Sequence, residues 1–372
     1  MSYNNVMTTI KLTKMQGCGN DFVIIDYAEY EKTNMPMSEL AKKVCDRNFG
    51  VGADGMIIPR LVEAAKQLGS QAAKLSHAPS PDGERICGRT ERSESGLRKD
   101  GAYCGEATNA ELLEQRANSR QGWDGVISTV NSENSQEQHT DTVLSSYRPI
   151  ALLPYDISWY FYNSDGSTAQ MCGNGIRCFA KYVYDKKILD KKTFSVLTGA
   201  GIIKPELLDD GNVRVNMGTP ILEDEKIPFK GERKINILDK TFSITPVSMG
   251  NPHCVIFTDN DPMEDAKKYG PYIEKHEYFP EKTNTEFVRV KSRNEIDLCV
   301  YERGCGITLA CGTGACASVV AGVLNNLTED KVKVNLPGGA VFIDWQGSLA
   351  DDLKDIYMTG PANYSFVADY ML

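Results

Sequence analysis

Two cysteines of this chain each stand directly before a Gly-x-Gly sequence, Cys172 in MCGNG (171–175) and Cys311 in ACGTG (310–314). The pattern predicts that each cysteine starts a helix. A thiol at a helix N-terminus lies among unpaired backbone N–H groups at the positive end of the helix macrodipole, so its thiolate is favoured. Two such thiols on opposite faces of one ligand would act as an acid and a base. The inversion of a carbon centre requires such a pair.

The surroundings of the two cysteines repeat as well. Asn163 lies nine residues before Cys172, and Glu302 lies nine residues before Cys311. Each of these two residues ends a strand-like run, WYFY (159–162) or LCVY (298–301). Further upstream, GNDFVI (19–24) returns as GNPHCVI (250–256). These equivalences predict a duplicated unit with a pseudo-symmetric site between the two copies.

Residues next to these motifs are candidates for ligand binding. The glycines after each cysteine let the backbone approach an anion closely, so each helix start could hold one side of a carboxylate. Arg303 would clamp a carboxylate, and Glu302 would hold an ammonium group. His253 is either a general base or a buried structural group, and we assign it a supporting role. The GxGxxG match at 50–55 follows a helix and precedes a strand, the reverse of a dinucleotide fingerprint, so it is interpreted as a turn.

Composition narrows the class of protein. A chain of 372 residues is long enough for two domains, and a net charge of −9 without a basic cluster argues against nucleic acid as a partner. Lys11 and Lys14 stand where a signal peptide needs an apolar core, and no apolar run reaches the roughly 18 residues of a spanning helix. We therefore expect a cytoplasmic protein with no membrane partner. The 11 cysteines are spread out and the four histidines are scattered, so we expect reduced thiols and no metal site.

The sequence also predicts the elements that position these residues. Residues 10–26 are expected to form two strands joined by a tight turn at 17–19. Ser38 is predicted to cap a helix over 39–45, and the turn at 50–55 leads into a strand at 56–58. Segment 315–324 carries no charged residue. A helix that is apolar all round is buried all round, so we expect a central helix wrapped by strands, with Cys311 at its mouth.

The first copy of the repeat is interrupted. The separation from Asn251 to Cys311 is 60 residues, whereas that from Asn20 to Cys172 is 152, a difference of 92 residues. The additional residues, at about 60–151, are rich in Ser, Glu, Gln, Asn and Arg and poor in apolar side chains. Such a composition predicts a disordered segment. Within it, TNAE (108–111) is a capping box that predicts one short helix.

Together these motifs resemble those of the diaminopimelate epimerases, through KMQGCGNDF (14–22), NSDGS (163–167) with MCGNG, GNPH (250–253), ERG (302–304) with ACGTG, and GPA (360–362). The resemblance implies an α/β (α+β) fold of two pseudo-symmetric halves, each a curled, mostly antiparallel sheet wrapped around a central helix. It implies interconversion of LL- and meso-2,6-diaminopimelate without a cofactor, in lysine and peptidoglycan precursor biosynthesis. Cys172 and Cys311 would transfer the protons. The implied substrate site is lined by Asn20, Asn163, Gly173, Asn174, Asn251, Asn284, Glu302, Arg303, Gly312 and Thr313.

We expect an N-terminal half at 1–211, a C-terminal half at 212–357 and a final segment, 358–372, that returns to the N-terminal half. Thr168 and Ile307, each four residues before its cysteine, replace a glutamate that is usual in the family. Two alternatives are considered: a two-cysteine racemase acting on another amino acid, such as proline or hydroxyproline, and an inactive paralogue whose insertion recruits a partner. The oligomeric state also stays open, with a homodimer as one option.

Overall fold

The computed structural model describes residues 8–61, 155–345, 347 and 354–372. All of them belong to one of the two compact units into which the chain divides, 1–65 together with 153–372. The predicted insertion and its short helix at 108–111 lie outside the described residues. No helix among the described residues is long and apolar enough to cross a membrane.

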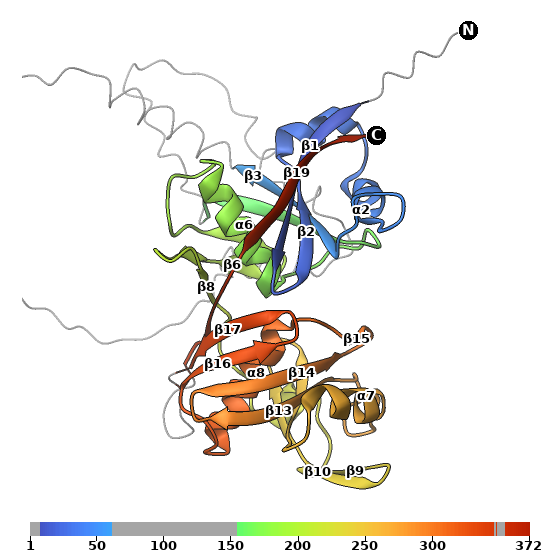
Figure 1. Ribbon diagram of the computed structural model, residues 1–372, viewed down its shortest axis with the longest axis vertical. Helices are drawn as coiled ribbons and strands as arrows, with labels where there is room; N and C mark the ends of the chain where they lie inside the picture. Colours follow the sequence, from blue (N-terminus) through green and yellow to red (C-terminus); the bar gives the residue numbers. More distant parts are fainter. Residues whose placement is uncertain (1–7, 62–154, 346, 348–353) are drawn as a thin grey trace, which may run out of the picture. The chain divides into compact units, whose positions relative to one another are not determined.

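The first of two large sheets has seven strands in the order β19-β1-β2-β3-β4-β5-β6. Its strands are β19 (Asn363–Met371), β1 (Thr9–Gly17), β2 (Asn20–Ile24), β3 (Gly55–Leu61), β4 (Ile157–Asn163), β5 (Val196–Thr198) and β6 (Gly201–Ile203). β19, from the end of the chain, runs beside β1 (Figure 1). The helical elements of this part are α1 (Tyr27–Tyr30), η1 (Glu31–Thr33), α2 (Met37–Cys45) and α6 (Gly173–Asp185).

The second sheet has ten strands in the order β11-β12-β13-β14-β16-β17-β18-β8-β7, with β15 paired to β14. They are β11 (Thr245–Ser248), β12 (Pro252–Phe257), β13 (Asn284–Ser292), β14 (Glu295–Glu302), β15 (Gly306–Ile307), β16 (Lys331–Leu336), β17 (Gly339–Asp344), β18 (Tyr357–Gly360), β8 (Val213–Asn216) and β7 (Glu206–Leu207). The remaining elements are the hairpin of β9 (Lys234–Ile237) and β10 (Lys240–Ser243) and the helices η2 (Asp224–Lys226), α7 (Pro262–Ile273) and α8 (Gly312–Leu324).

Both sheets follow one pairing pattern. Along β1 to β6, successive pairs are antiparallel, parallel, antiparallel, parallel and antiparallel. The series β11-β12-β13-β14-β16-β17 alternates in the same way. The helices occupy equivalent places too, because α2 and α7 each connect the first parallel pair, and α6 and α8 the second. The predicted duplication and the mostly antiparallel α+β fold are thus confirmed.

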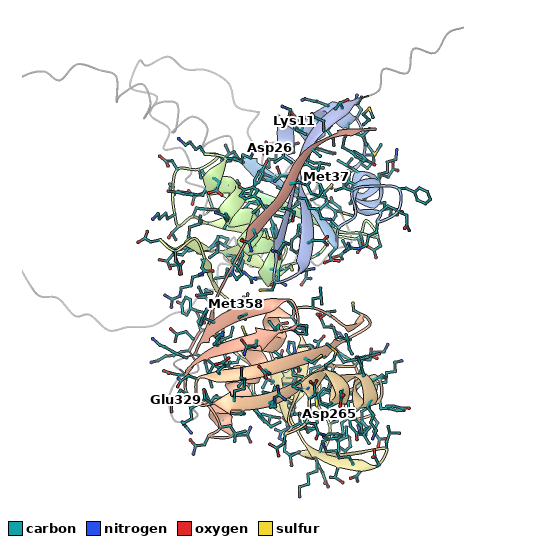
Figure 2. All side chains as sticks on the ribbon, in the orientation of Figure 1. Lys11, Asp26, Met37, Asp265, Glu329 and Met358 are labelled. Carbon is teal, nitrogen blue, oxygen red and sulfur yellow. The ribbon has the colours of Figure 1, made fainter. Side chains whose placement is uncertain are left out.

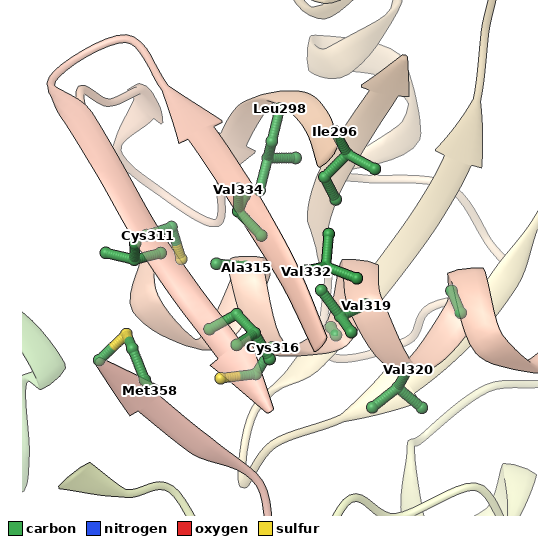
Figure 3. Close-up of a cluster of buried hydrophobic side chains, with 14 of the residues drawn as sticks. Ile296, Leu298, Cys311, Ala315, Cys316, Val319, Val320, Val332, Val334 and Met358 are labelled. Atoms are coloured by element: carbon green, nitrogen blue, oxygen red, sulfur yellow. The ribbon is translucent and has the colours of Figure 1, made fainter. Parts of the chain in front are cut away.

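α8 is the apolar central helix that the sequence predicts. Its residues from Gly314 to Gly322 are buried, and it packs against β11, β12, β13, β14 and β17. Figure 3 shows Ala315, Val319 and Val320 of this helix among the side chains of the surrounding strands. α6 is the equivalent helix of the first sheet and packs against β1, β2 and β3.

Two sequence expectations need comment. The helix expected at 39–45 begins at Met37, which is labelled in Figure 2. Its N-cap is Pro36, so the assignment of Ser38 as the cap is wrong. Pro36 lacks the N–H that a helix start leaves unpaired, and its φ of −57° is the angle that the proline ring imposes, so it is suited to the position just before the helix. The division at 211 and 357 stays a proposal. The chain passes from the ten-stranded sheet back to the seven-stranded sheet between β18 and β19, at Pro361 and Ala362.

Candidate active site

Cys172 and Cys311 are the N-cap residues of α6 and α8. Both have extended backbone angles, with φ of −142° at Cys172 and −125° at Cys311, so the chain turns into the helix at the next residue. The Gly175 N–H donates to the Cys172 sulfur at 3.5 Å. The predicted helix starts are therefore confirmed at both cysteines.

The first turns of α6 and α8 lie against each other. A Cβ atom added to Gly312 would lie 3.8 Å from the Cα of Gly173. The side chain of Met358, from β18, contacts both turns. A Cβ added to Gly173 would lie 2.6 Å from its Cε, and a Cβ added to Gly312 would lie 3.2 Å from the same atom. Figure 3 shows Met358 and Cys311 at the edge of the apolar cluster around α8. Glycine after each cysteine thus allows the two helix starts to meet.

Asn20 connects Cys172 to a charged cluster. The Cys172 thiol donates to Oδ1 of Asn20 at 3.5 Å, and Nδ2 of Asn174 donates to the same oxygen at 3.4 Å. Nδ2 of Asn20 donates to the Asp54 carboxylate, which also pairs with Arg47 at 2.7 Å. The amide of Asn20 is therefore fixed with its oxygen toward Cys172.

Asn251 takes the equivalent place near Cys311. Its Nδ2 donates to Oγ1 of Thr313 at 3.4 Å, and that hydroxyl lies 3.5 Å from the Cys311 sulfur. Oδ1 of Asn251 faces Nε2 of His253 at 3.0 Å. The carboxylate of Glu302 accepts a hydrogen bond from Thr308 and interacts electrostatically with the Cys311 thiol. Each asparagine of the repeated GN motif is thus hydrogen-bonded to the cysteine of its own half, Asn20 directly and Asn251 through Thr313.

Burial raises the pKa of both thiols, which differs from the expectation drawn from helix position alone. Backbone N–H groups of Asn174 and Gly175 lower the pKa of Cys172, but loss of solvent outweighs them. The pKa of Cys311 is raised further, because the Glu302 and Glu286 carboxylates oppose a negative charge there. Burial likewise raises the pKa of the Glu302 carboxyl. Both thiols therefore favour the protonated form.

Two other predicted residues, Asn163 and Asn284, lie at strand ends. Asn163 ends β4 and donates to Ser167 Oγ at 2.9 Å. Asn284 is buried, with Nδ2 donating to the Pro252 carbonyl at 2.9 Å and Oδ1 accepting from the Arg303 backbone N–H at 3.0 Å. Asn284 thereby fixes the backbone at Arg303, whose own side chain is exposed.

Two buried charged residues were missed by the sequence interpretation. Arg177 of α6 is fully buried and donates to the Gly173 and Pro361 carbonyls at 3.0 and 3.2 Å, and its charge lowers the pKa of Cys172. Glu286 of β13 is also fully buried, beside His253. A charged residue within an otherwise apolar helix face or strand is the signal that could have found each of them. No group of three or more His, Cys, Asp or Glu side chains suited to a metal ion occurs in the described part of the chain.

Family and sequence comparisons both find diaminopimelate epimerases. A family model described as diaminopimelate epimerase matches residues 130–223 and 245–365. The diaminopimelate epimerase of Carboxydothermus hydrogenoformans is 37% identical over 98% of this chain and 100% of its own length. The chloroplastic diaminopimelate epimerase of Oryza sativa subsp. japonica is 35% identical over 96% of this chain and 79% of its own length.

Solved structures share the fold at low sequence identity. A PhzF-family phenazine biosynthesis protein from Bacillus anthracis has a TM-score of 0.56 at 14% identity and covers 98% of this chain and 100% of its own. A hydroxyproline epimerase from Agrobacterium vitis has a TM-score of 0.53 at 9% identity and covers 100% of this chain and 94% of its own. At these identities the likeness shows the fold alone.

Proposed function

The chain belongs to the diaminopimelate epimerase family, and on that premise we propose that it interconverts LL-2,6-diaminopimelate and meso-diaminopimelate by proton transfer between Cys172 and Cys311. The observation that carries the proposal is the pair of cysteines that cap α6 and α8, whose first turns lie against each other at Gly173 and Gly312. The product would supply lysine and peptidoglycan precursor synthesis. A cytoplasmic location fits this role.

The reaction needs one thiolate and one thiol. The thiolate removes the proton from the α-carbon on one face, and the thiol gives its proton to the opposite face. The first cysteine thereby becomes the thiol and the second the thiolate, so protons balance and the reverse reaction uses the same groups. An α-proton is far less acidic than a thiol, so the negative charge that develops on the carboxylate must be stabilised by preorganised donors. The backbone N–H groups of Gly173, Asn174, Gly312 and Thr313 are proposed for this role.

The remaining predicted residues are proposed to recognise the distal end of the substrate. Arg303 carries a positive charge for a second carboxylate, and Glu302 carries a carboxyl group for an ammonium. Asn20, Asn163 and Asn251 offer amide groups around the same centre. Asn284 contributes by fixing the backbone at Arg303. A second carboxylate clamp favours a dicarboxylic substrate over proline or hydroxyproline, which each carry a single carboxylate.

The substrate assignment is tested by incubating the purified protein with LL-diaminopimelate and separating the stereoisomers by chiral chromatography. We expect conversion to a mixture of LL and meso forms, and no racemisation of L-proline or trans-4-hydroxy-L-proline in parallel reactions. Activity should persist after dialysis against a chelator and in the presence of hydroxylamine, which traps pyridoxal phosphate. Racemisation of proline with no turnover of diaminopimelate would overturn the assignment.

We also propose that the protein forms a homodimer through β19. This nine-residue strand stands at one end of the seven-strand order, so one row of its backbone groups has no strand partner among the described residues. It also exposes four apolar side chains, Tyr364, Phe366, Val367 and Met371. Long apolar edge strands favour pairing with another chain. Light scattering should give a dimer mass for the wild type and a monomer mass for Val367→Lys, whereas a monomeric wild type would contradict the proposal.

A further inference from the structure

A second polar network lies beneath Cys311, and none of the proposed proton-transfer steps uses it. Glu286 on β13 and His253 on β12 are both fully buried, with 2.7 Å between Oε1 of the carboxyl and Nδ1 of the ring. Nε2 of His253 lies 3.0 Å from Oδ1 of Asn251. The other carboxyl oxygen, Oε2 of Glu286, finds no hydrogen-bond partner in the part of the chain that the structure describes. A buried carboxyl with an unpartnered oxygen is costly and calls for an explanation.

The hydrogen bonds fix where the protons are. Oδ1 of Asn251 can only accept, so Nε2 of His253 carries a proton. An ionised carboxylate facing an unprotonated Nδ1 at 2.7 Å would set two lone pairs against each other. The contact therefore holds one proton, shared between Glu286 and His253, and the pair is neutral overall whichever atom carries it. Burial raises the pKa of Glu286, which agrees with a proton retained at this position.

This pair lies near the reacting cysteine. A Cβ added to Gly314, in the first turn of α8, would lie 2.9 Å from Oε1 of Glu286 and 3.2 Å from the Cys311 sulfur. Oε1 of Glu286 and the Cys311 sulfur therefore both lie close to Gly314. The charged or titratable groups that face Glu286 are His253 and Cys254 on β12, Glu302 on β14 and Cys311 at the start of α8. A change of charge on Glu286 would consequently act on the proton affinity of Cys311.

The equivalent place among the described residues of the first half holds no such pair. In the register of the parallel strands, Val255 stands opposite Glu286, and Ile24 stands opposite Ile57 at the equivalent place. Ile57 therefore occupies the position of Glu286, and Phe22 that of His253. Below Cys172 the buried charge is instead that of Arg177. At these equivalent strand positions of the described chain the network occurs on the Cys311 side and not on the Cys172 side, so the duplicated fold does not require it.

We propose that Glu286 is a positioning residue for the epimerisation, acting through His253 to hold the Asn251 amide with its N–H groups toward α8. The inference rests on the proposed function and deepens it. Glu286 itself touches no reacting atom. Its contact with Nδ1 holds the His253 ring with Nε2 toward Asn251, and Asn251 in turn donates to Thr313 next to the Cys311 sulfur.

The first test is a measurement on the wild type that needs no activity. In protein labelled with ¹⁵N-histidine, we expect a strongly downfield ring N–H signal from a histidine whose two nitrogens are both hydrogen-bonded. It is assigned to His253 by its loss in His253→Gln. The signal should disappear in Glu286→Gln and persist in Glu295→Gln, a control that removes a charge from the partly exposed start of β14. Absence of the signal from the wild type would overturn the inference, even if the protein epimerises diaminopimelate normally.

The second test is a double-mutant cycle on epimerase activity. Glu286→Gln keeps the size of the side chain, so we expect the variant to stay folded, with a kcat/KM lower by about tenfold, carried by kcat. Because Glu286 acts through His253, Glu286→Gln combined with His253→Gln should lose no more than His253→Gln alone. Additive losses, or Glu286→Gln activity equal to that of wild type, would overturn the inference. A wild type inactive on diaminopimelate would instead refute the proposed function.

Discussion

Cys172 and Cys311 occupy equivalent positions in the two halves, but the charges around them differ. Arg177 lowers the pKa of Cys172 and so partly opposes the effect of burial, whereas Glu302 and Glu286 add to that effect at Cys311. The first thiolate is therefore expected at Cys172. Duplicated positions with different surroundings allow one thiolate and one thiol to coexist at the same pH.

Replacing either cysteine should stop the reaction. Cys172→Ala and Cys311→Ala each remove one member of the proton-transfer pair, so kcat should fall by roughly a hundredfold to ten-thousandfold or more. Circular dichroism should show both variants folded. Cys305→Ala is the matched control, since Cys305 is an exposed cysteine in the loop before Cys311. Near wild-type turnover in either active-site variant would rule out the two-thiol mechanism.

The pH dependence follows from the direction of the thiol shifts. A raised pKa means that a thiol loses its proton only at higher pH, so the reactive thiolate becomes more abundant as pH rises. For the free enzyme, kcat/KM for LL-diaminopimelate should climb with pH along a limb centred above 9.0, the ordinary thiol value. It should fall again where both thiols ionise. A rising limb centred below 9.0 would contradict the direction assigned here.

At the scale of elements, the first turns of α6 and α8 differ in how much room they leave. A Cβ on Gly175 would meet only ordinary contacts, the nearest at 3.4 Å, whereas one on Gly314 would lie 2.9 Å from Glu286. Gly175→Ala should therefore stabilise α6 by up to about 1 kcal/mol. Gly314→Ala should cost about 1–3 kcal/mol of unfolding free energy, through overpacking.

Denaturant unfolding of these two variants provides the comparison, with kcat measured alongside. Because the added methyl of Gly314→Ala would press on the Cys311 sulfur, that variant should also lose activity, while Gly175→Ala should keep it. Equal stability and equal activity in the two variants would show that the contact between Glu286 and α8 does not constrain the site.

Local patterns in the sequence were sufficient to predict several elements. Gly-x-Gly after a cysteine predicted both helix starts, and the absence of charge over 315–324 predicted the buried α8. The assignment of Ser38 as the N-cap is wrong because the helix starts two residues earlier, directly after Pro36. Burial of Arg177 and Glu286 depends on chain segments far apart in sequence, Pro361 for the one and His253 for the other. Helix and strand periodicity carries no information on such contacts.

For the molecule as a whole, the repeat in the sequence corresponds to a repeat of strand order, and the long segment at 62–154 interrupts only one copy. Leu61 and Ile157 are direct partners in the antiparallel pair of β3 and β4. The chain therefore leaves and re-enters at neighbouring strand ends, where a short turn would suffice. The composition of the sequence locates the inserted segment, but it does not predict that the strands on either side of it, β3 and β4, pair with each other.

Replacing residues 62–154 with a Gly/Ser turn of about five residues should therefore leave the protein folded and active. A shorter connection costs less entropy to close, so unfolding free energy should stay equal or rise by up to about 3 kcal/mol. Yield, melting temperature and kcat/KM for LL-diaminopimelate should be compared with the full chain. Loss of folded, active protein would show that this segment contributes to the core or to the site.

The account depends most on transfer of the proton by two different cysteines. The measurement that tests this most directly is epimerisation of LL-diaminopimelate in heavy water, followed by mass spectrometry of each stereoisomer at early times. Because the incoming proton comes from a thiol in exchange with solvent, the early meso product should carry deuterium at the inverted centre while unreacted substrate stays largely unlabelled. Early meso product that keeps the original hydrogen, together with deuterium in unreacted substrate, would contradict the account and indicate a single base acting on both faces.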